Sequence, residues 1–355
     1  MPAVRDTWLN PALALLLGAL AGTVFLAVHA PLPWMIGPLA VMATCNLLGA
    51  ELRAPRFARP TGQVVIGVAL GLYFTPAVAR ETLAYWPLML LASVVAIVLG
   101  VVGGWVLARV SGTDAKTAFF ASVPGGATEM TLLGERFGAR VDRIALAQSL
   151  RVVVVVVAVP VALTMSGAHG SDAYAPAHVG FDASGLAMLF AAAVAAGGLL
   201  RLLNMPNAFM FGPLAAAIAL TASGVELSSM PGPVSALAQL LLGCALGTRF
   251  ERRSFERAPR FVAGVVASVM VALAASAGVA AAVSAAFGLP AASLVLAMAP
   301  GGIAEMCITA KVLQLGVPLV TATQVARVFV LLATTGAGFR LTRHLARRLG
   351  RSKQP

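Results

Sequence analysis

The sequence contains one seven-residue motif twice, and this repeat constrains the fold more than any other feature. The motif reads PGGATEM at residues 124–130 and PGGIAEM at residues 300–306, so the two copies lie 176 residues apart (300 − 124). Proline removes a backbone donor, and glycine costs about 1 kcal/mol relative to alanine inside a helix. Each motif lies within an apolar run and therefore predicts a break in a buried helix.

Other short motifs return at nearly the same offset. GPLA occurs at residues 37–40 and 212–215, and the pair Gln148 and Arg151 returns as Gln324 and Arg327. This regular spacing over nearly the whole chain indicates an internal duplication.

The composition is that of a polytopic helical membrane protein. Of the 355 residues, 59% are hydrophobic and 11% are charged, and the mean hydropathy is +0.91. Apolar runs of about 20 residues recur along the chain, as transmembrane helices require. The net charge of +12 is spread between these runs. It therefore indicates basic cytoplasmic loops and not a nucleic-acid surface.

The basic residues also predict a topology. With a cytoplasmic N-terminus and re-entrant Pro-Gly-Gly elements, only four of the 25 Lys and Arg residues lie outside the cytoplasmic segments: Arg80, Lys311, Arg151 and Arg327. Five crossings and one re-entrant element per repeat give an odd number of crossings. We therefore expect an all-α polytopic membrane protein of two inverted repeats, each with about five transmembrane helices plus one broken, re-entrant helical element.

The apolar runs and their repetition predict the domain bounds. Residues 1–166 form membrane repeat 1, residues 167–182 an extracytoplasmic linker, residues 183–340 membrane repeat 2, and residues 341–355 a basic cytoplasmic tail. We expect both termini in the cytoplasm.

Inverted repeats bring two broken helices together near the bilayer midplane, where transporters of this kind bind substrate. The glycines Gly125, Gly126, Gly301 and Gly302 leave backbone N–H groups at the start of the following helix, where they suit an anion or a polar group. Two readings of the glutamates Glu129 and Glu305 stay open. They are proton- or cation-coupling carboxylates, or they cap their own helices.

Intramembrane polar residues complete the candidate site. Arg151 and Arg327 need a partner. They either form structural ion pairs with the glutamates or hold a substrate carboxylate. Gln148 and Gln324 either bind a polar ligand or join helices. Thr128 flanks Glu129 and has Ala304 as its counterpart, so a cation site would be asymmetric.

Metal-dependent chemistry finds little support in the sequence. The four histidines fall at segment ends or in loops, and the three cysteines are scattered in apolar segments. We expect no metal site, no cofactor and no enzyme activity.

With its paired motifs PWMIGPLA and NAFMFGPLA, and PGGATEM and PGGIAEM, the chain resembles the AbrB-duplication family of bacterial inner-membrane proteins. Members of that family are often labelled as ammonia monooxygenases or as regulators of gene expression. The family is distantly similar to the cation:proton antiporter and anion transporter superfamily. The resemblance implies a secondary transporter fold in a bacterial inner membrane and transfers no site residue.

The resulting prediction is an ion-coupled secondary transporter of a small polar or anionic solute, with its site between the two broken helices. The alternative is a membrane regulator or sensor that affects gene expression indirectly. We expect the solute or ion and the lipid bilayer as partners, and no nucleic acid. A homodimer stays open.

Overall fold

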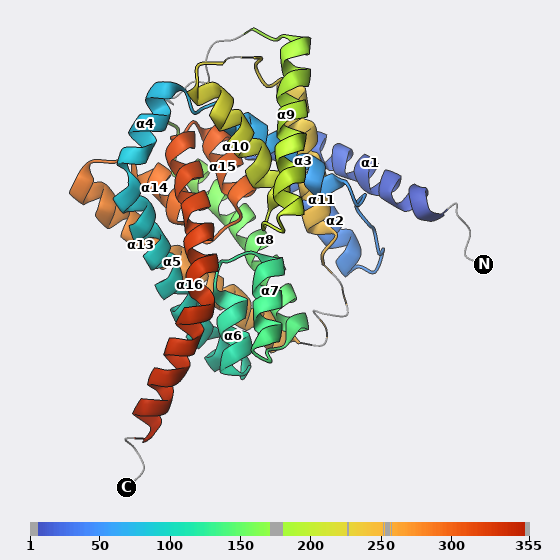
Figure 1. The fold of residues 1–355 in the computed structure, drawn as a ribbon. Coiled ribbons are helices and arrows are strands. Elements are labelled where there is room, and N and C mark those ends of the chain that lie inside the picture. Colours follow the sequence, from blue (N-terminus) through green and yellow to red (C-terminus); the bar gives the residue numbers. More distant parts are fainter. Residues whose placement is uncertain are drawn as a thin grey trace. The chain divides into compact units, whose positions relative to one another are not determined.

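The computed structural model describes residues 6–170, 180–225, 227–250, 252, 256 and 258–351, with side chains between residues 9 and 335 of these ranges. All regular structure in this part of the chain is helical (Figure 1). The helices are α1 (Asp6–Ala27), α2 (Pro33–Leu47), α3 (Ala58–Gly71), α4 (Pro76–Ala84), α5 (Trp86–Ser111), α6 (Ala115–Ser122), α7 (Ala127–Arg136), α8 (Val141–Met165), α9 (Ala183–Leu202), α10 (Ala208–Ala222), α11 (Gly232–Gly247), α13 (Pro259–Phe287), α14 (Ala291–Met298), α15 (Ile303–Leu313) and α16 (Val317–Arg351).

The two predicted breaks are confirmed. Helix α6 ends at Ser122 and α7 begins at Ala127, while α14 ends at Met298 and α15 begins at Ile303. The order of helix lengths also repeats. Helices α2 and α10 each have 15 residues, α6 and α14 each have 8, and α7 and α15 have 10 and 11. The inverted relation of the two halves stays a prediction.

Within the described residues, six helices are long and apolar enough to cross a membrane: α1, α5, α8, α9, α13 and the first part of α16. The consecutive helices α3 and α4 form a further apolar pair that is bent by 93°. The fold is therefore that of an all-helical membrane protein, as predicted. Helices α2, α3, α10 and α11 have 14 to 16 residues. At about 1.5 Å per residue each spans about 21–24 Å, which is short for a bilayer core of about 30 Å. The predicted five crossings per repeat depend on these helices and stay a prediction.

The chain forms two compact units that both draw on the two halves of the sequence. Unit 1 contains residues 1–85, 156–258 and 302–321, and unit 2 contains residues 86–155, 259–301 and 322–355. Helix α8 therefore begins in unit 2 and ends in unit 1. The two sequence repeats predicted above have different bounds from these units, because helices from each half pack with helices from the other.

In unit 1, glycines allow helices to cross closely. A Cβ atom on Gly212 of α10 would lie only 2.6 Å from the carbonyl carbon of Ala196 in α9, and one on Gly37 of α2 would lie 2.8 Å from the oxygen of Ala21 in α1. Both glycines belong to a GPLA motif, so the repeated motif marks the same kind of close helix crossing in both halves. Buried aliphatic residues fill the remaining space; one such cluster consists of Val64, Val68, Leu189, Ala193 and Ala217.

In unit 2, α5 packs along α13, and the short helices α6 and α14 pack against this pair (Figure 1). Glycine again sets the spacing: a Cβ atom on Gly104 of α5 would lie 3.3 Å from the oxygen of Ala118 in α6. A buried cluster that includes Phe120, Val123 and Met130 holds the two sides of the first break together. Unit 2 therefore contains both short helices that end at the breaks, α6 and α14.

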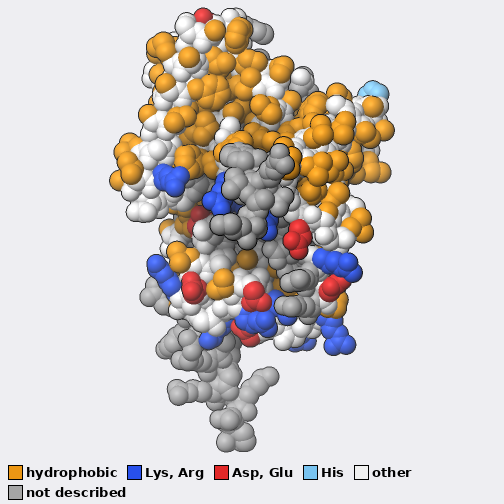
Figure 2. All heavy atoms as spheres, turned by 90° about the vertical axis from the view of Figure 1, so that its right-hand side faces the viewer, with side chains coloured by type: hydrophobic (Ala, Val, Ile, Leu, Met, Phe, Trp, Pro, Cys, Tyr) orange, Lys and Arg blue, Asp and Glu red, His pale blue; other side chains and the backbone are white. Residues whose placement is uncertain are grey.

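Large hydrophobic side chains are exposed over wide areas of the surface. On α1, Leu16, Leu20 and Val24 are each more than half exposed, and on α9 Leu202 is 80% exposed. Figure 2 shows hydrophobic side chains over much of one face, with the charged side chains gathered in a separate region of that face. Apolar surface of this extent is normal for a protein whose solvent is lipid.

The close crossing of α9 and α10 predicts opposite effects for two neighbouring Gly→Ala substitutions. We expect Gly212→Ala to destabilise the protein by about 1–3 kcal/mol, because the new methyl group meets the backbone of α9. Gly198→Ala adds a methyl group to open space in α9. It should be neutral or stabilise by up to about 1 kcal/mol. Thermal unfolding midpoints of the purified variants in detergent test the pair, and equal midpoints would contradict the close crossing.

Candidate functional site

The repeated motif places a glutamate carboxylate over a glycine in both halves. Gly126 and Gly302 each precede the first residue of a helix, and Glu129 and Glu305 are the third helical residues. A Cβ atom on Gly126 would lie 3.2 Å from Cδ of Glu129, and one on Gly302 would lie 2.8 Å from Cδ of Glu305, with a carboxylate oxygen closer still in both cases. The second glycine of each motif therefore leaves room for the carboxylate. Gly126 also has a φ of +92°, which favours glycine.

The third helical position is where a glutamate reaches back to cap its own helix. Both carboxylates lie close to the glycine that precedes their helix, which is compatible with the capping alternative. Neither carboxylate forms a hydrogen bond or an ion pair with another described residue. The coupling role and the capping role therefore both stay open.

The buried pair Gln148 and Arg151 binds the end of the first broken helix. The Gln148 amide donates to the carbonyl oxygens of Phe120 at 2.9 Å, Ala121 at 3.3 Å and Val123 at 2.9 Å. Arg151 also donates to the Val123 oxygen, at 3.1 Å. The last carbonyls of a helix have no partner within that helix. These side chains supply donors from α8 in place of the missing backbone groups.

Gln324 and Arg327 of α16 repeat this arrangement at the second break. The Gln324 amide donates to the oxygens of Leu296 at 2.7 Å, Ala297 at 3.3 Å and Ala299 at 3.3 Å. Arg327 donates to the oxygens of Ala299 and Gly301. In both halves, the three hydrogen bonds of the glutamine join residues that are 28, 27 and 25 positions apart. The bond of Arg151 to Val123 and that of Arg327 to Ala299 each join residues that are 28 positions apart. The sequence predicted intramembrane polar groups at these positions, and the carbonyl partners are the new finding.

The structure places one arginine and both prolines at a single cavity inside unit 2. The cavity has a volume of about 20 Å³, and Arg151, Pro124 and Pro300 line it. The other lining residues are Ala96, Leu99, Gly100, Leu107, Ala121, Ser122, Val265, Ser268, Val269, Ala272 and Met298. This cavity brings the two breaks together at one place, and its serines Ser122 and Ser268 were not predicted. Hydroxyl groups are common in membrane helices, so their sequence pattern carried no signal.

The remaining predicted residues lie around the breaks. Gly125 packs under Met130, since a Cβ atom there would lie 2.5 Å from Cε of Met130. Gly301 accepts from Arg327 at 2.9 Å, and Thr128 is exposed. The sequence therefore identified the break itself and did not identify all residues that surround it.

A second group of charged residues lies in unit 1 beside Glu305. Burial lowers the pKa of Arg249 to about 10; the positive charge of Arg59 also lowers it, and the negative charge of Glu305 raises it. Arg59 is at the start of α3, and Arg249 follows the end of α11. From the sequence, both arginines were interpreted only as cytoplasmic topology signals. The position of Arg249 next to the end of a buried helix brings it to Glu305.

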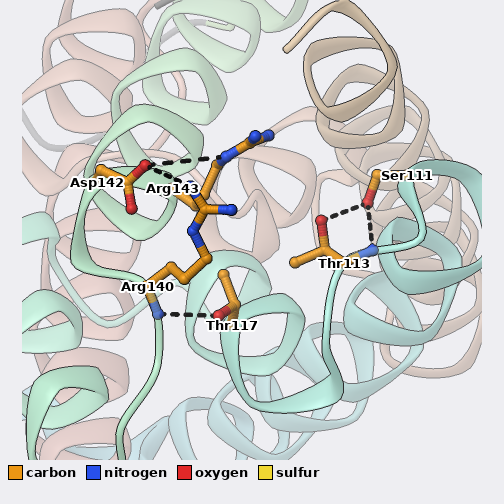
Figure 3. A network of polar contacts seen from close by, with 6 residues as sticks. All are labelled: Ser111, Thr113, Thr117, Arg140, Asp142 and Arg143. Atoms are coloured by element: carbon orange, nitrogen blue, oxygen red, sulfur yellow. Dashed lines mark hydrogen bonds and ion pairs between the residues drawn. The ribbon is translucent and has the colours of Figure 1, made fainter. Parts of the chain in front are cut away.

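Polar contacts in unit 2 fix the start of the first broken helix (Figure 3). The backbone N–H of Arg140 donates to the Thr117 hydroxyl of α6 at 2.9 Å, and Asp142 pairs with Arg140 at 3.2 Å and with Arg143 at 3.9 Å. The Asp114 side chain accepts from the N–H of Thr117 and caps α6. These contacts tie the start of α6 to the start of α8, the helix that carries Gln148 and Arg151.

Within the described residues, no group of three or more His, Cys, Asp or Glu side chains has the geometry to hold a metal ion.

The capping arrangement predicts a strong effect for replacing either glutamine. We expect Gln148→Met and Gln324→Met each to destabilise the protein by about 1–3 kcal/mol, because buried carbonyls lose their donors. Gln239→Met is the control, since the Gln239 amide is half-buried and forms no hydrogen bond with another described residue. Thermal unfolding of the three variants in detergent measures the difference. Equal losses in all three would show that the carbonyl contacts add no stability.

Comparison with known proteins gives a consistent relationship over most of the chain. The chain is 27% identical over 312 residues to the "Putative regulator AbrB" of Escherichia coli (strain K12), which covers 87% of this chain and 90% of that protein. It is 25% identical over 373 residues to the "Uncharacterized protein YhjN" of Bacillus subtilis (strain 168), which covers 96% of this chain and 94% of that protein. Residues 34–343 match the family described as "Transition state regulatory protein AbrB". The match includes both broken helices and covers most of the chain. The chain therefore belongs to the AbrB family.

Proposed function

We propose that this protein is a secondary membrane transporter of a small polar or anionic solute. The observation that carries the proposal is the cavity in unit 2, where Pro124 and Pro300 of the two broken helices meet the buried Arg151. Broken helices within membranes occur where protein or a water-filled cavity satisfies the freed backbone groups, and transporters bind solutes at such breaks. A buried guanidinium at the same place favours an anionic or strongly polar solute.

Glu129 and Glu305 are the proposed ion-coupling groups. Each carboxylate lies at the first turn after a break. Glu129 forms no ion pair with another described residue, and Glu305 interacts electrostatically with Arg249. A carboxylate in such a position binds and releases a proton or a cation as its surroundings change. The arginine and glutamine side chains hold the breaks in shape while this happens.

The topology belongs to the same proposal. We place the protein in a bacterial inner membrane, with both termini in the cytoplasm and the two halves inverted. The distribution of Lys and Arg along the sequence supports this orientation. A homodimer is compatible with the exposed apolar surface of α1 and α9.

Electrical recording from proteoliposomes tests the transporter proposal. The purified protein is exposed on a solid-supported membrane to organic acids, amino acids, inorganic anions, and pH or sodium steps. We expect a current with one class of solute, and a loss of at least about tenfold in Glu129→Gln or Glu305→Gln if that carboxylate carries the coupling ion. Glu135→Gln is the matched control, because Glu135 is an exposed glutamate of α7, the same helix as Glu129.

Two outcomes would contradict parts of the proposal. Equal currents in wild type and both glutamine variants would assign the glutamates to helix capping alone. An absence of current from folded protein over the whole panel would contradict transport.

A regulatory role is the alternative, and the name of the Escherichia coli relative supports it. A membrane regulator of gene expression would act through a stoichiometric cytoplasmic partner. Crosslinking in intact cells, followed by purification, tests this role. A partner retained by a transport-inactive glutamate variant would favour regulation over transport.

A further inference from the structure

We propose that the cavity in unit 2 is a binding site for one small monovalent anion, bound by Arg151 and Ser122, with Ser268 positioning Ser122. All three residues line the cavity, and all three belong to unit 2. The inference rests on the proposed function for its biological use and deepens it by naming the class of ligand.

The charge of the cavity favours an anion. Arg151 is 4% exposed and lines a cavity whose lining residues include no Asp or Glu. The other walls are almost entirely apolar. In such surroundings, where water is scarce, a small anion beside a guanidinium is strongly favoured over a neutral or cationic ligand.

The hydroxyl group of Ser122 adds a directed donor and fixes the position of the ligand. The Ser268 hydroxyl donates to the oxygen of Gly103 at 2.9 Å, and the two serine oxygens are 3.5 Å apart. Because Ser268 already donates to Gly103, the Ser122 hydroxyl is the donor of the 3.5 Å contact, and it exchanges this long hydrogen bond for one to the ligand. Ser122 lies at the end of α6, next to the carbonyl that Arg151 binds, so the helix break positions both donors together.

The size of the cavity limits the ligand. A volume of about 20 Å³ holds one particle of the size of a water molecule or a chloride ion, since one water needs about 10–15 Å³ by this measure. Larger organic anions require the cavity to widen. Chloride and bromide are therefore the appropriate probes.

The duplication makes this site asymmetric. At the offset of 176 residues, Ser122 corresponds to Met298, and both side chains line this cavity. One wall of the cavity is therefore polar and the equivalent wall is apolar. Ser122→Met copies the residue of the second half into the first, and it removes the donor while it fills the space.

Chloride-35 NMR on the full-length protein in detergent tests the site. The line width of chloride is measured in a gluconate background at constant ionic strength, with bromide as the competitor. We expect wild type to broaden the chloride line saturably, bromide to reverse the broadening, and Ser122→Met to weaken chloride binding by at least about tenfold, which corresponds to the loss of one charge-assisted or buried hydrogen bond. Ser268→Ala should weaken it by a smaller factor.

Ser276→Ala is the matched control. Ser276 lies on α13, as Ser268 does, is 1% exposed and donates only to Leu273 of its own helix. Its substitution should leave chloride binding unchanged, and unfolding midpoints of all variants show whether they are folded. Saturable binding that is equal in wild type and Ser122→Met would place the anion elsewhere and overturn the inference, as would an absence of saturable binding in wild type.

The result separates this inference from the transport proposal. Chloride binding at the cavity without any transport current would support the site and contradict transport. A solute current from protein that binds no chloride would support transport and overturn the anion site.

Discussion

The structure depends on how the carbonyl groups of a broken helix find donors away from water. Helices α6 and α14 each end inside unit 2, where an unsatisfied carbonyl costs several kcal/mol in a lipid environment. A glutamine and an arginine from a long neighbouring helix supply these donors in both halves, through bonds that bridge the same sequence separations. Arg151 both satisfies the first broken helix and lines the cavity beside it, so this interaction joins the break to the cavity.

The local rules of backbone chemistry made much of this fold predictable. Pro-Gly-Gly cannot continue a helix, so the two breaks at residues 124–126 and 300–302 were visible in the sequence. The apolar runs likewise predicted the membrane helices. The carbonyl partners of Arg151 and Arg327 were not predictable, because every residue has a backbone carbonyl and no residue type identifies the one that will be bound. For that reason the sequence suggested carboxylates as partners, whereas the described hydrogen bonds go to carbonyl oxygens.

Parts of the candidate site escaped prediction for a different reason. Ser122 and Ser268 come from helices that are 146 residues apart in the sequence, and only the packing of unit 2 brings their hydroxyls to one cavity. Arg249 was interpreted from the sequence as a topology signal, and its interaction with Glu305 was not predicted. In both cases the information lies in tertiary contacts, to which residue type and spacing give no direct access.

The duplication also separates residues that serve the fold from residues that would serve the proposed ligand. Positions that are the same in both halves, such as Gln148 with Gln324 and Gly126 with Gly302, satisfy the broken backbone or give room to a carboxylate. Any chain with this pair of breaks needs them twice.

Positions that differ between the halves are not needed to satisfy the broken backbone. Ser122 corresponds to Met298, and Arg249 beside Glu305 corresponds to Tyr73 in the first half. Such substitutions change the charge and the donors around each break while they leave the break intact. A site for one ligand needs this kind of asymmetry, because two identical walls would present the same group twice. The selectivity of the proposed site is therefore expected to depend on the diverged positions, whereas the repeated positions supply the architecture and the charged groups that both halves share.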